Sequence, residues 1–230
     1  MKIKSHIPNT LTLLNLFSGV AGIIWVLDGQ LMFGAYFVFI AAGFDFLDGF
    51  VARLLKVQSE IGKELDSLAD VVSFGVLPGI ILFSLVKEQS ELEWLPYLTL
   101  IVPMLSAYRL AKFNLDTRQT DQFIGLPTPA NALFISTLPH LALEFQSFGN
   151  WLTSPWIMVI VAWVFAILLI LELPLIALKF KNFSFKDNKI RFTLIGLGIA
   201  SFAWMQLAGI PLLILAYIAL SILEQAIGSE

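Results

Sequence analysis

Long apolar stretches follow one another along this chain, and only short polar breaks separate them. Of its 230 residues, 58% are hydrophobic and 13% are charged, whereas a soluble domain carries about 25% charged residues. Because a helix needs about 20 mainly apolar residues to cross the hydrocarbon core of a bilayer, the pattern predicts an all-α polytopic membrane helix bundle. Eight spanning segments are predicted, near Asn9–Leu27, Leu31–Leu54, Glu64–Val86, Leu95–Asn114, Pro129–Phe145, Pro155–Lys179, Ile190–Leu207 and Ile210–Ile227.

The placement of basic residues supports this count and predicts an orientation. With the N-terminus in the cytoplasm, thirteen of the 14 lysines and arginines fall on the cytoplasmic side, and only Lys87 falls on the other. Cytoplasmic loops of membrane proteins carry such an excess of Lys and Arg. We therefore expect an integral protein of the cytoplasmic membrane with one transmembrane domain over residues 1–230, in which helices over 190–227 are added to a core over 1–180. The chain has no cysteine, which excludes disulfide and thiol chemistry.

Four aspartates lie at the predicted cytoplasmic boundary of the membrane. Asp45 and Asp48 are three residues apart at the end of the second segment, and Asp66 and Asp70 are four apart at the start of the third, so each pair shares a helix face. A turn containing Gly62 makes these two helices antiparallel, which brings the four carboxylates together. Carboxylates near lipid are costly unless compensated, and hard divalent cations prefer oxygen ligands. The sequence therefore predicts a site for two divalent metal ions, Mg²⁺ or Mn²⁺.

The residues that follow the first two aspartates suit a phosphate group. Gly49 lets a ligand approach the backbone, Ala52 keeps the surface low, and Arg53 can form paired hydrogen bonds with phosphate oxygens. A plainer interpretation makes the aspartates solvated helix ends or ion-pair partners of Arg53, Lys56 and Lys63. That interpretation suits any single aspartate, but four at this spacing, with a glycine and an arginine between them, favour a phosphate-handling site.

The whole run from Asp45 to Asp70 reads D-x-x-D-G-x-x-A-R-x8-G-x-x-x-D-x-x-x-D. It resembles the signature of the CDP-alcohol phosphatidyltransferases, and every fixed position is filled. The resemblance implies that Asp45 and Asp66 bridge two metal ions and that Asp48 holds one of them. It implies that Asp70 holds the other ion and acts as the general base toward the acceptor hydroxyl.

The same resemblance implies a set of donor-binding residues. Gly49 and Arg53 are expected to contact the CDP portion of CDP-diacylglycerol, and Ser59 falls where relatives place a hydroxyl near the nucleotide.

A polar stripe also follows the first predicted segment. Asn9, Thr12, Asn15 and Gly19 recur at intervals of three, three and four residues, so they share one helix face. Two interpretations stay open: the stripe makes hydrogen bonds between helices, or it forms part of the wall of the donor site. On the second interpretation, Asn9 and Thr12 join the residues that bind CDP-diacylglycerol.

Two later stretches bear on the acceptor. Arg109 and Lys112 share a face at the cytoplasmic end of the fourth segment, where anchoring to lipid headgroups is the alternative role. The loop Phe123–Asn131 then enters the fifth segment. Together with the first segment, these stretches resemble the small integral-membrane phosphatidylserine synthases of the family. This resemblance implies transfer of a phosphatidyl group to L-serine, with Arg109 or Lys112 at the serine carboxylate and Asn131 as a hydrogen-bond partner.

Other functions stay open at this point. Glycerol 3-phosphate and inositol phosphate are alternative acceptors, because related synthases share the aspartate core. A transporter is a different class, since intramembrane acids often mark ion pathways, although here the acids gather at one membrane face and no inverted repeat is visible. A third class, a non-catalytic assembly scaffold, would not need the pair of Asp66 and Asp70 and should survive its loss. The expected partners are the bilayer and the two substrates, with no nucleic acid, and the family resemblance permits a homodimer.

Overall fold

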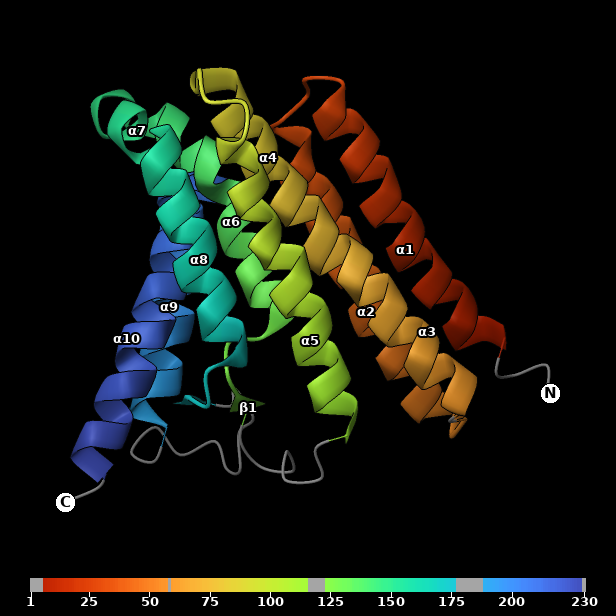
Figure 1. Cartoon of the computed structure of the whole chain (residues 1–230). Helices are drawn as coiled ribbons and strands as arrows, with labels where there is room; N and C mark the ends of the chain where they lie inside the picture. The colour runs from red at the N-terminus through yellow and green to blue at the C-terminus, as the bar shows by residue number, and fades with distance from the viewer. Residues whose placement is uncertain (1–5, 58, 116–122, 177–187, 229–230) are drawn as a thin grey trace.

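The computed structural model describes residues 6–57, 59–115, 123–176 and 188–228, and these residues form a bundle of helices (Figure 1). The all-α architecture that the sequence predicts is therefore confirmed. The helices are α1 (His6–Leu27), α2 (Phe33–Leu55), α3 (Glu60–Asp70), α4 (Leu77–Gln89), α5 (Ile101–Leu115), α6 (Thr128–Glu144), α7 (Gln146–Leu152), α8 (Pro155–Ile170), α9 (Lys189–Met205) and α10 (Ile210–Gly228).

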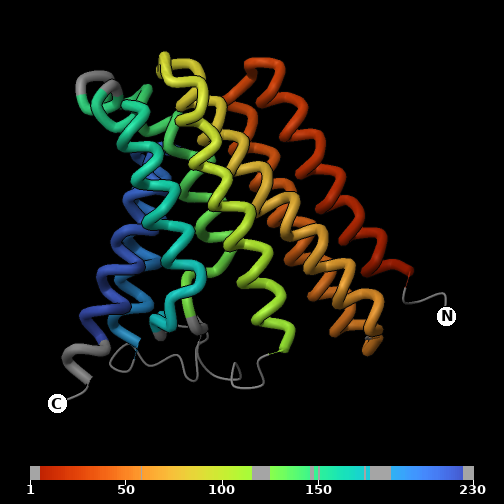
Figure 2. The backbone as a smooth tube through the Cα atoms, viewed as in Figure 1, coloured from red at the N-terminus to blue at the C-terminus, as the bar shows by residue number. Residues whose placement is uncertain are grey.

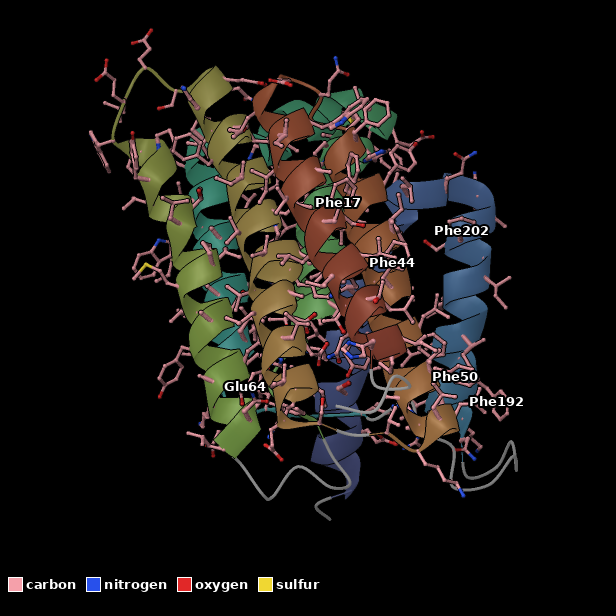
Figure 3. The ribbon with its side chains drawn as sticks, turned by 90° about the vertical axis from the view of Figure 1, so that its right-hand side faces the viewer. Phe17, Phe44, Phe50, Glu64, Phe192 and Phe202 are labelled. Carbon is pink, nitrogen blue, oxygen red and sulfur yellow. The ribbon has the colours of Figure 1, made fainter. Side chains whose placement is uncertain are left out.

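Four helical stretches in the described ranges are long and apolar enough to cross a membrane, namely His6–Leu27, Phe33–Leu55, Glu60–Gln89 and Lys189–Glu224. The helix Pro155–Ile170 is apolar but shorter. Large hydrophobic side chains also cover the outside of the bundle, and Figure 3 shows Phe17 and Phe202 on two of its helices. A surface this apolar indicates contact with lipid. The total of eight spans stays a prediction.

The centre of the bundle is the stretch that contains α3 and α4. Of the 18 residues that form its apolar part, 67% are buried, whereas the corresponding shares for α1 and α2 are 33% and 22%. Leu77, Ile81 and Leu82 are fully buried, because α4 contacts α1, α2, α5, α6 and α8 (Figure 2). Residues Val71–Val76 between α3 and α4 are π-helical, so the helix axis continues with a wider turn directly after Asp70.

The sixth predicted segment is wrong beyond Ile170, where α8 ends. Pro174 explains the early end, because proline removes a backbone donor and disfavours helical geometry at the residue before it. Instead, Pro174–Leu175 (β2) pairs in antiparallel register with Phe123–Ile124 (β1). Residues 177–179 of that predicted segment lie outside the described ranges. The strand pair fixes the chain that leads into α6 beside the end of α8.

Gly125 makes this junction possible. Its φ is +78°, which favours glycine, and its N–H donates to the carbonyl oxygen of Leu173 at 2.8 Å. A Cβ at this position would lie 2.7 Å from the carbonyl oxygen of Leu169.

Replacing Gly125 by Ala should therefore destabilise the protein by more than the roughly 1–3 kcal/mol that a non-glycine residue costs in the left-handed region. Gly29→Ala is the matched control, because Gly29 has a φ of +82° but no atom within 4 Å of its Cβ position. Thermal unfolding in detergent measures both variants. An equal loss of stability in the two variants would show that the contact with Leu169 adds nothing to the destabilisation of Gly125→Ala.

The last two helices form a hairpin. Gln206 has a φ of +48° and ends α9, and the Ser201 hydroxyl donates to the carbonyl oxygen of Gly209 at 2.9 Å. The break predicted between the seventh and eighth segments thus separates two helices that pack against each other.

Candidate active site

The antiparallel pair of α2 and α3 carries the four aspartates. Lys56 ends α2 in a left-handed conformation, with its N–H directed at the carbonyl oxygens of Ala52 and Arg53. Ser59 then caps α3, because its hydroxyl accepts a hydrogen bond from the Gly62 N–H at 3.0 Å, one of the donors that a helix start leaves without a partner. These two helix ends turn the chain back within a few residues.

This turn brings three of the carboxylates together. Oxygen atoms of Asp45, Asp48 and Asp66 all lie within 4.8 Å of one another. Asp70 lies one turn further along α3, is 8% exposed, and is close enough to interact electrostatically with Asp45 and Asp66. The predicted convergence is therefore present for Asp45, Asp48 and Asp66, whereas Asp70 lies next to this cluster and not within it.

The surroundings of these carboxylates fit divalent metal ions. One carboxylate oxygen of Asp66 is buried and has no hydrogen-bond partner among the described residues. Within the described ranges, no lysine or arginine nitrogen lies within 4.0 Å of a carboxylate oxygen of any of the four aspartates. The ion pair found there joins Lys112 to Glu172. Buried anions need a charged partner or a metal, and an all-oxygen donor set suits Mg²⁺ or Mn²⁺.

The plainer interpretation, in which nearby basic residues form ion pairs with the aspartates, finds no ion pair among the described residues, although Arg53 is close enough to interact electrostatically with Asp48. Lys63 donates instead to the carbonyl oxygen of Asn114 at 3.1 Å. Arg53 extends over Gly49, where an added Cβ would lie 3.3 Å from its Nη1 atom. Gly49 therefore leaves room for the guanidinium as well as for a ligand.

A cavity of about 520 Å³ opens beside the carboxylates. Four of the predicted donor-binding residues line it together with Asp48 and Asp66. These four residues are Asn9, Thr12, Gly49 and Ser59. The fifth predicted donor residue, Arg53, is not among the lining residues, although its guanidinium lies over Gly49, which lines the cavity.

The polar stripe of α1 faces the aspartates. The Thr12 hydroxyl donates to the Oδ2 atom of Asp48 at 2.6 Å, and the Asn15 amide donates to the Oδ1 atom of Asp70 at 3.1 Å. The stripe thus makes hydrogen bonds between helices, as the first interpretation predicts. Asn9 and Thr12 also line the cavity, and their role toward the donor stays a prediction.

Arg109 on α5 contacts α6, and further buried polar side chains lie one turn away on these two helices. Arg109 is 8% exposed, its Nη1 donates to the Thr128 hydroxyl at 3.1 Å, and it interacts electrostatically with Asp70. Asn131 and Ser106 are fully buried. In the part of the chain that the structure describes, the buried polar atoms without a hydrogen-bond partner include both amide atoms of Asn131, the Ser106 hydroxyl and the Nε atom of Arg109. Because buried polar atoms are rarely left without partners, this group is suited to a polar ligand.

Lys112 does not join this group as the sequence led us to expect. Its ammonium pairs with the Glu172 carboxylate at 2.9 Å, and the two side chains are 41% and 56% exposed. The pair ties the end of α5 to the segment after α8. A helix-face argument placed Lys112 beside Arg109, but it could not show a partner 60 residues further along the chain.

Ser106 and Thr128 were missed by the sequence reasoning. Each lies three residues before a residue that was singled out, Arg109 and Asn131 respectively, so each shares a helix face with it. That spacing was the available signal, but small polar residues in membrane helices are usually packing residues.

The membrane-crossing helices and the polar site at one end of α2 and α3 define an integral membrane protein with a site for a charged ligand. The sequence model of the CDP-alcohol phosphatidyltransferase family matches residues 5–168, and the chain belongs to this family. All twelve predicted site residues fall within the match, while α9 and α10 lie outside it.

Curated relatives with related names are similar to this chain. A CDP-diacylglycerol–serine O-phosphatidyltransferase of Mycobacterium leprae is 35% identical over 178 residues, which cover 74% of this chain and 57% of the relative. The protein of that name in Bacillus subtilis is 33% identical over 129 residues, 54% of this chain and 70% of the relative. An archaetidylserine synthase of Methanothermobacter thermautotrophicus is 36% identical over 141 residues, 59% of each chain. The match thus spans less than two thirds of the mycobacterial and archaeal relatives.

Proposed function

We propose that this protein transfers a phosphatidyl group from CDP-diacylglycerol to the hydroxyl of L-serine, which yields phosphatidylserine and CMP. The observation that carries the proposal is the buried Arg109, which interacts electrostatically with Asp70 and donates to Thr128, in a chain whose relatives are named for serine transfer. Buried polar side chains, Ser106 and Asn131, lie one helical turn from Arg109 and from Thr128. Serine brings a carboxylate and an ammonium group. Arg109 suits the carboxylate, and the carbonyl oxygen of Asn131 suits the ammonium.

The cavity beside the aspartates suits the donor. The CDP end would lie among Asn9, Thr12, Gly49 and Ser59, with Arg53 directed at a phosphate oxygen. The aspartates Asp45, Asp48, Asp66 and Asp70 would hold two divalent ions, Mg²⁺ or Mn²⁺, which when bound offset the charge that develops on the diphosphate and on the departing CMP.

Asp70 is suited to the proton transfer. The serine hydroxyl oxygen forms a new bond to the lipid-side phosphorus, and the bond from that phosphorus to the CMP oxygen breaks. The hydroxyl proton passes to the Asp70 carboxylate, which is general base catalysis. Arg109 holds the serine carboxylate near Asp70 during this step, so that the hydroxyl is oriented for attack.

The site is proposed to face the cytoplasm of a cytoplasmic-membrane protein. The end of the bundle at which α1 begins is also where α2 and α5 end and where α3 and α9 begin (Figure 1). Described basic residues gather there, including Arg53, Lys63 and Lys189, whereas Lys87 closes α4 at the opposite end. This distribution supports the orientation, since basic residues favour the cytoplasmic side. Homodimerisation remains a prediction of the family resemblance.

The test is an acceptor panel. Purified protein in detergent micelles receives CDP-diacylglycerol with serine, glycerol 3-phosphate or inositol phosphate, and the released CMP is measured in each tube. We expect release with serine alone. Release with another acceptor and not with serine would correct the acceptor, and the absence of release in every tube would favour a transporter or a scaffold.

The Arg109→Met variant should respond in the same panel. Loss of a charged hydrogen bond of about 1.5–3 kcal/mol should raise the KM for serine by roughly one to two orders of magnitude, while the KM for CDP-diacylglycerol stays near that of the wild type. Lys112→Met is the matched control, because Lys112 is paired with Glu172. A larger effect at Lys112 than at Arg109 would reverse their assignment.

A further inference from the structure

We propose that Asn15 is a positioning residue for Asp70. Its amide group holds one oxygen of the Asp70 carboxylate and so orients the other toward the acceptor hydroxyl. This inference rests on the proposed function, because it takes Asp70 as the group that accepts the proton.

The contact itself is buried and directional. The Nδ2 atom of Asn15 donates to the Oδ1 atom of Asp70 at 3.1 Å, across 55 residues of sequence. Asn15 is fully buried and Asp70 is 8% exposed. Only the N–H₂ side of the amide attracts a carboxylate, because its oxygen and both carboxylate oxygens are acceptors. The bond therefore fixes the orientation of both side chains, and among the described residues no hydrogen bond is directed at the Oδ2 atom of Asp70.

A second bond fixes the backbone of α1 against the helix that carries Asp70. The Ser73 hydroxyl donates to the carbonyl oxygen of Asn15 at 3.0 Å, so Asn15 contacts the same helix through its side chain and through its backbone. Gly19, one turn further along α1, lies so close to Ser73 that a Cβ would overlap it. This close approach holds the two helices in one register.

Ser73 lies in the π-helical turn Val71–Val76. A π-helical turn contains more residues than an α-helical turn, and such turns are frequent at functional sites. The wider turn begins directly after Asp70, and α1 packs against it. The position of Asp70 is thus set by a non-standard turn and by the α1 residues that contact that turn.

The neighbouring donor on α1 follows the same pattern. Thr12 precedes Asn15 by three residues and donates to Asp48, so successive donors on one helix face meet two different carboxylates. Packing alone would not require Thr12 and Asn15 both to be directed at acids. Ser18 illustrates the ordinary arrangement, because its hydroxyl donates within its own helix to the carbonyl oxygen of Leu14.

The test compares Asn15→Leu with Ser18→Ala in the CMP-release assay. Leucine keeps a similar volume but cannot donate, so a misdirected carboxylate should lower kcat by about 10²-fold with little change in KM for serine or CDP-diacylglycerol. Ser18→Ala also removes a buried hydroxyl from α1 and should keep wild-type kcat. Asn15→Gln keeps an N–H₂ donor and should recover part of the loss.

A spectroscopic measurement separates positioning from a general loss of structure. In infrared spectra of metal-free protein, the carboxylate band of Asp70 is assigned by its absence in Asp70→Asn. We expect this band to shift in Asn15→Leu and to stay in place in Ser18→Ala. Should the leucine variant fail to fold, Asn15→Asp keeps the side-chain shape, replaces the donor by an acceptor, and should show the same loss and shift.

An unshifted band, or a kcat for Asn15→Leu equal to that of Ser18→Ala, would overturn the role of Asn15. This failure is distinct from failure of the proposed function. In the first case the wild type still transfers to serine, whereas in the second the wild type itself releases no CMP with serine.

Discussion

Asp70→Asn should lower the transfer to serine by about 10²–10⁴-fold, the range that a positioned general base contributes. The amide keeps the shape of the carboxylate but cannot accept the hydroxyl proton. Asp70 is 8% exposed, which limits the access of water that might replace it as the base. The measurement is CMP release from CDP-diacylglycerol in detergent with saturating serine.

Asp28→Asn is the matched control for this experiment. Asp28 follows α1 directly, in the turn before α2, at the end of the bundle opposite to the aspartate site (Figure 1). The Asp28→Asn variant should release CMP at the rate of the wild type. Wild-type turnover in Asp70→Asn would remove Asp70 from the role of base.

Removal of divalent metal should abolish activity altogether. Three carboxylates have oxygens within 4.8 Å of one another, with no basic partner in ion-pair range among the described residues. Without cations they repel one another and the negatively charged diphosphate as well. Treatment with a chelator should stop CMP release, and Mg²⁺ or Mn²⁺ should restore it.

The control is the same chelator saturated beforehand with Mg²⁺, which should leave activity intact. Full activity in protein shown by elemental analysis to be free of metal would contradict the proposed chemistry. Retention of CMP release after replacement of Asp66 by Asn would contradict it in a second way, because Asp66 contributes a buried oxygen without a partner.

The sequence predicted most of the helices because apolar length is a local property. The first segment was predicted to end at Leu27, where α1 does end. The second was predicted to end at Leu54, one residue before the end of α2. The sixth was too long, because hydropathy continues past Leu171 while the strand pairing and the close approach at Gly125 depend on a segment 50 residues away. Pairing of this kind is not visible in local composition.

The aspartate site was predictable for a similar reason. A short turn sends the chain back from α2 into α3, so the spacing within Asp45–Asp70 was enough to predict that carboxylates of the two helices approach each other, as three of them do. The surroundings of the acceptor group were less accessible, because they combine α5 with α6. Lys112 was assigned to that group from its helix face, and the structure pairs it with Glu172. The contact between Asn15 and Asp70 likewise joins residues that no local pattern links.

The central claim is that divalent ions bind between α2 and α3. Anomalous scattering from crystals soaked in Mn²⁺ tests this claim most directly. The account predicts two peaks surrounded by the carboxylates of Asp45, Asp48, Asp66 and Asp70, and their loss in crystals of a variant with Asp45 and Asp66 replaced by Asn. Well-ordered carboxylates with no anomalous peak between the two helices would contradict it.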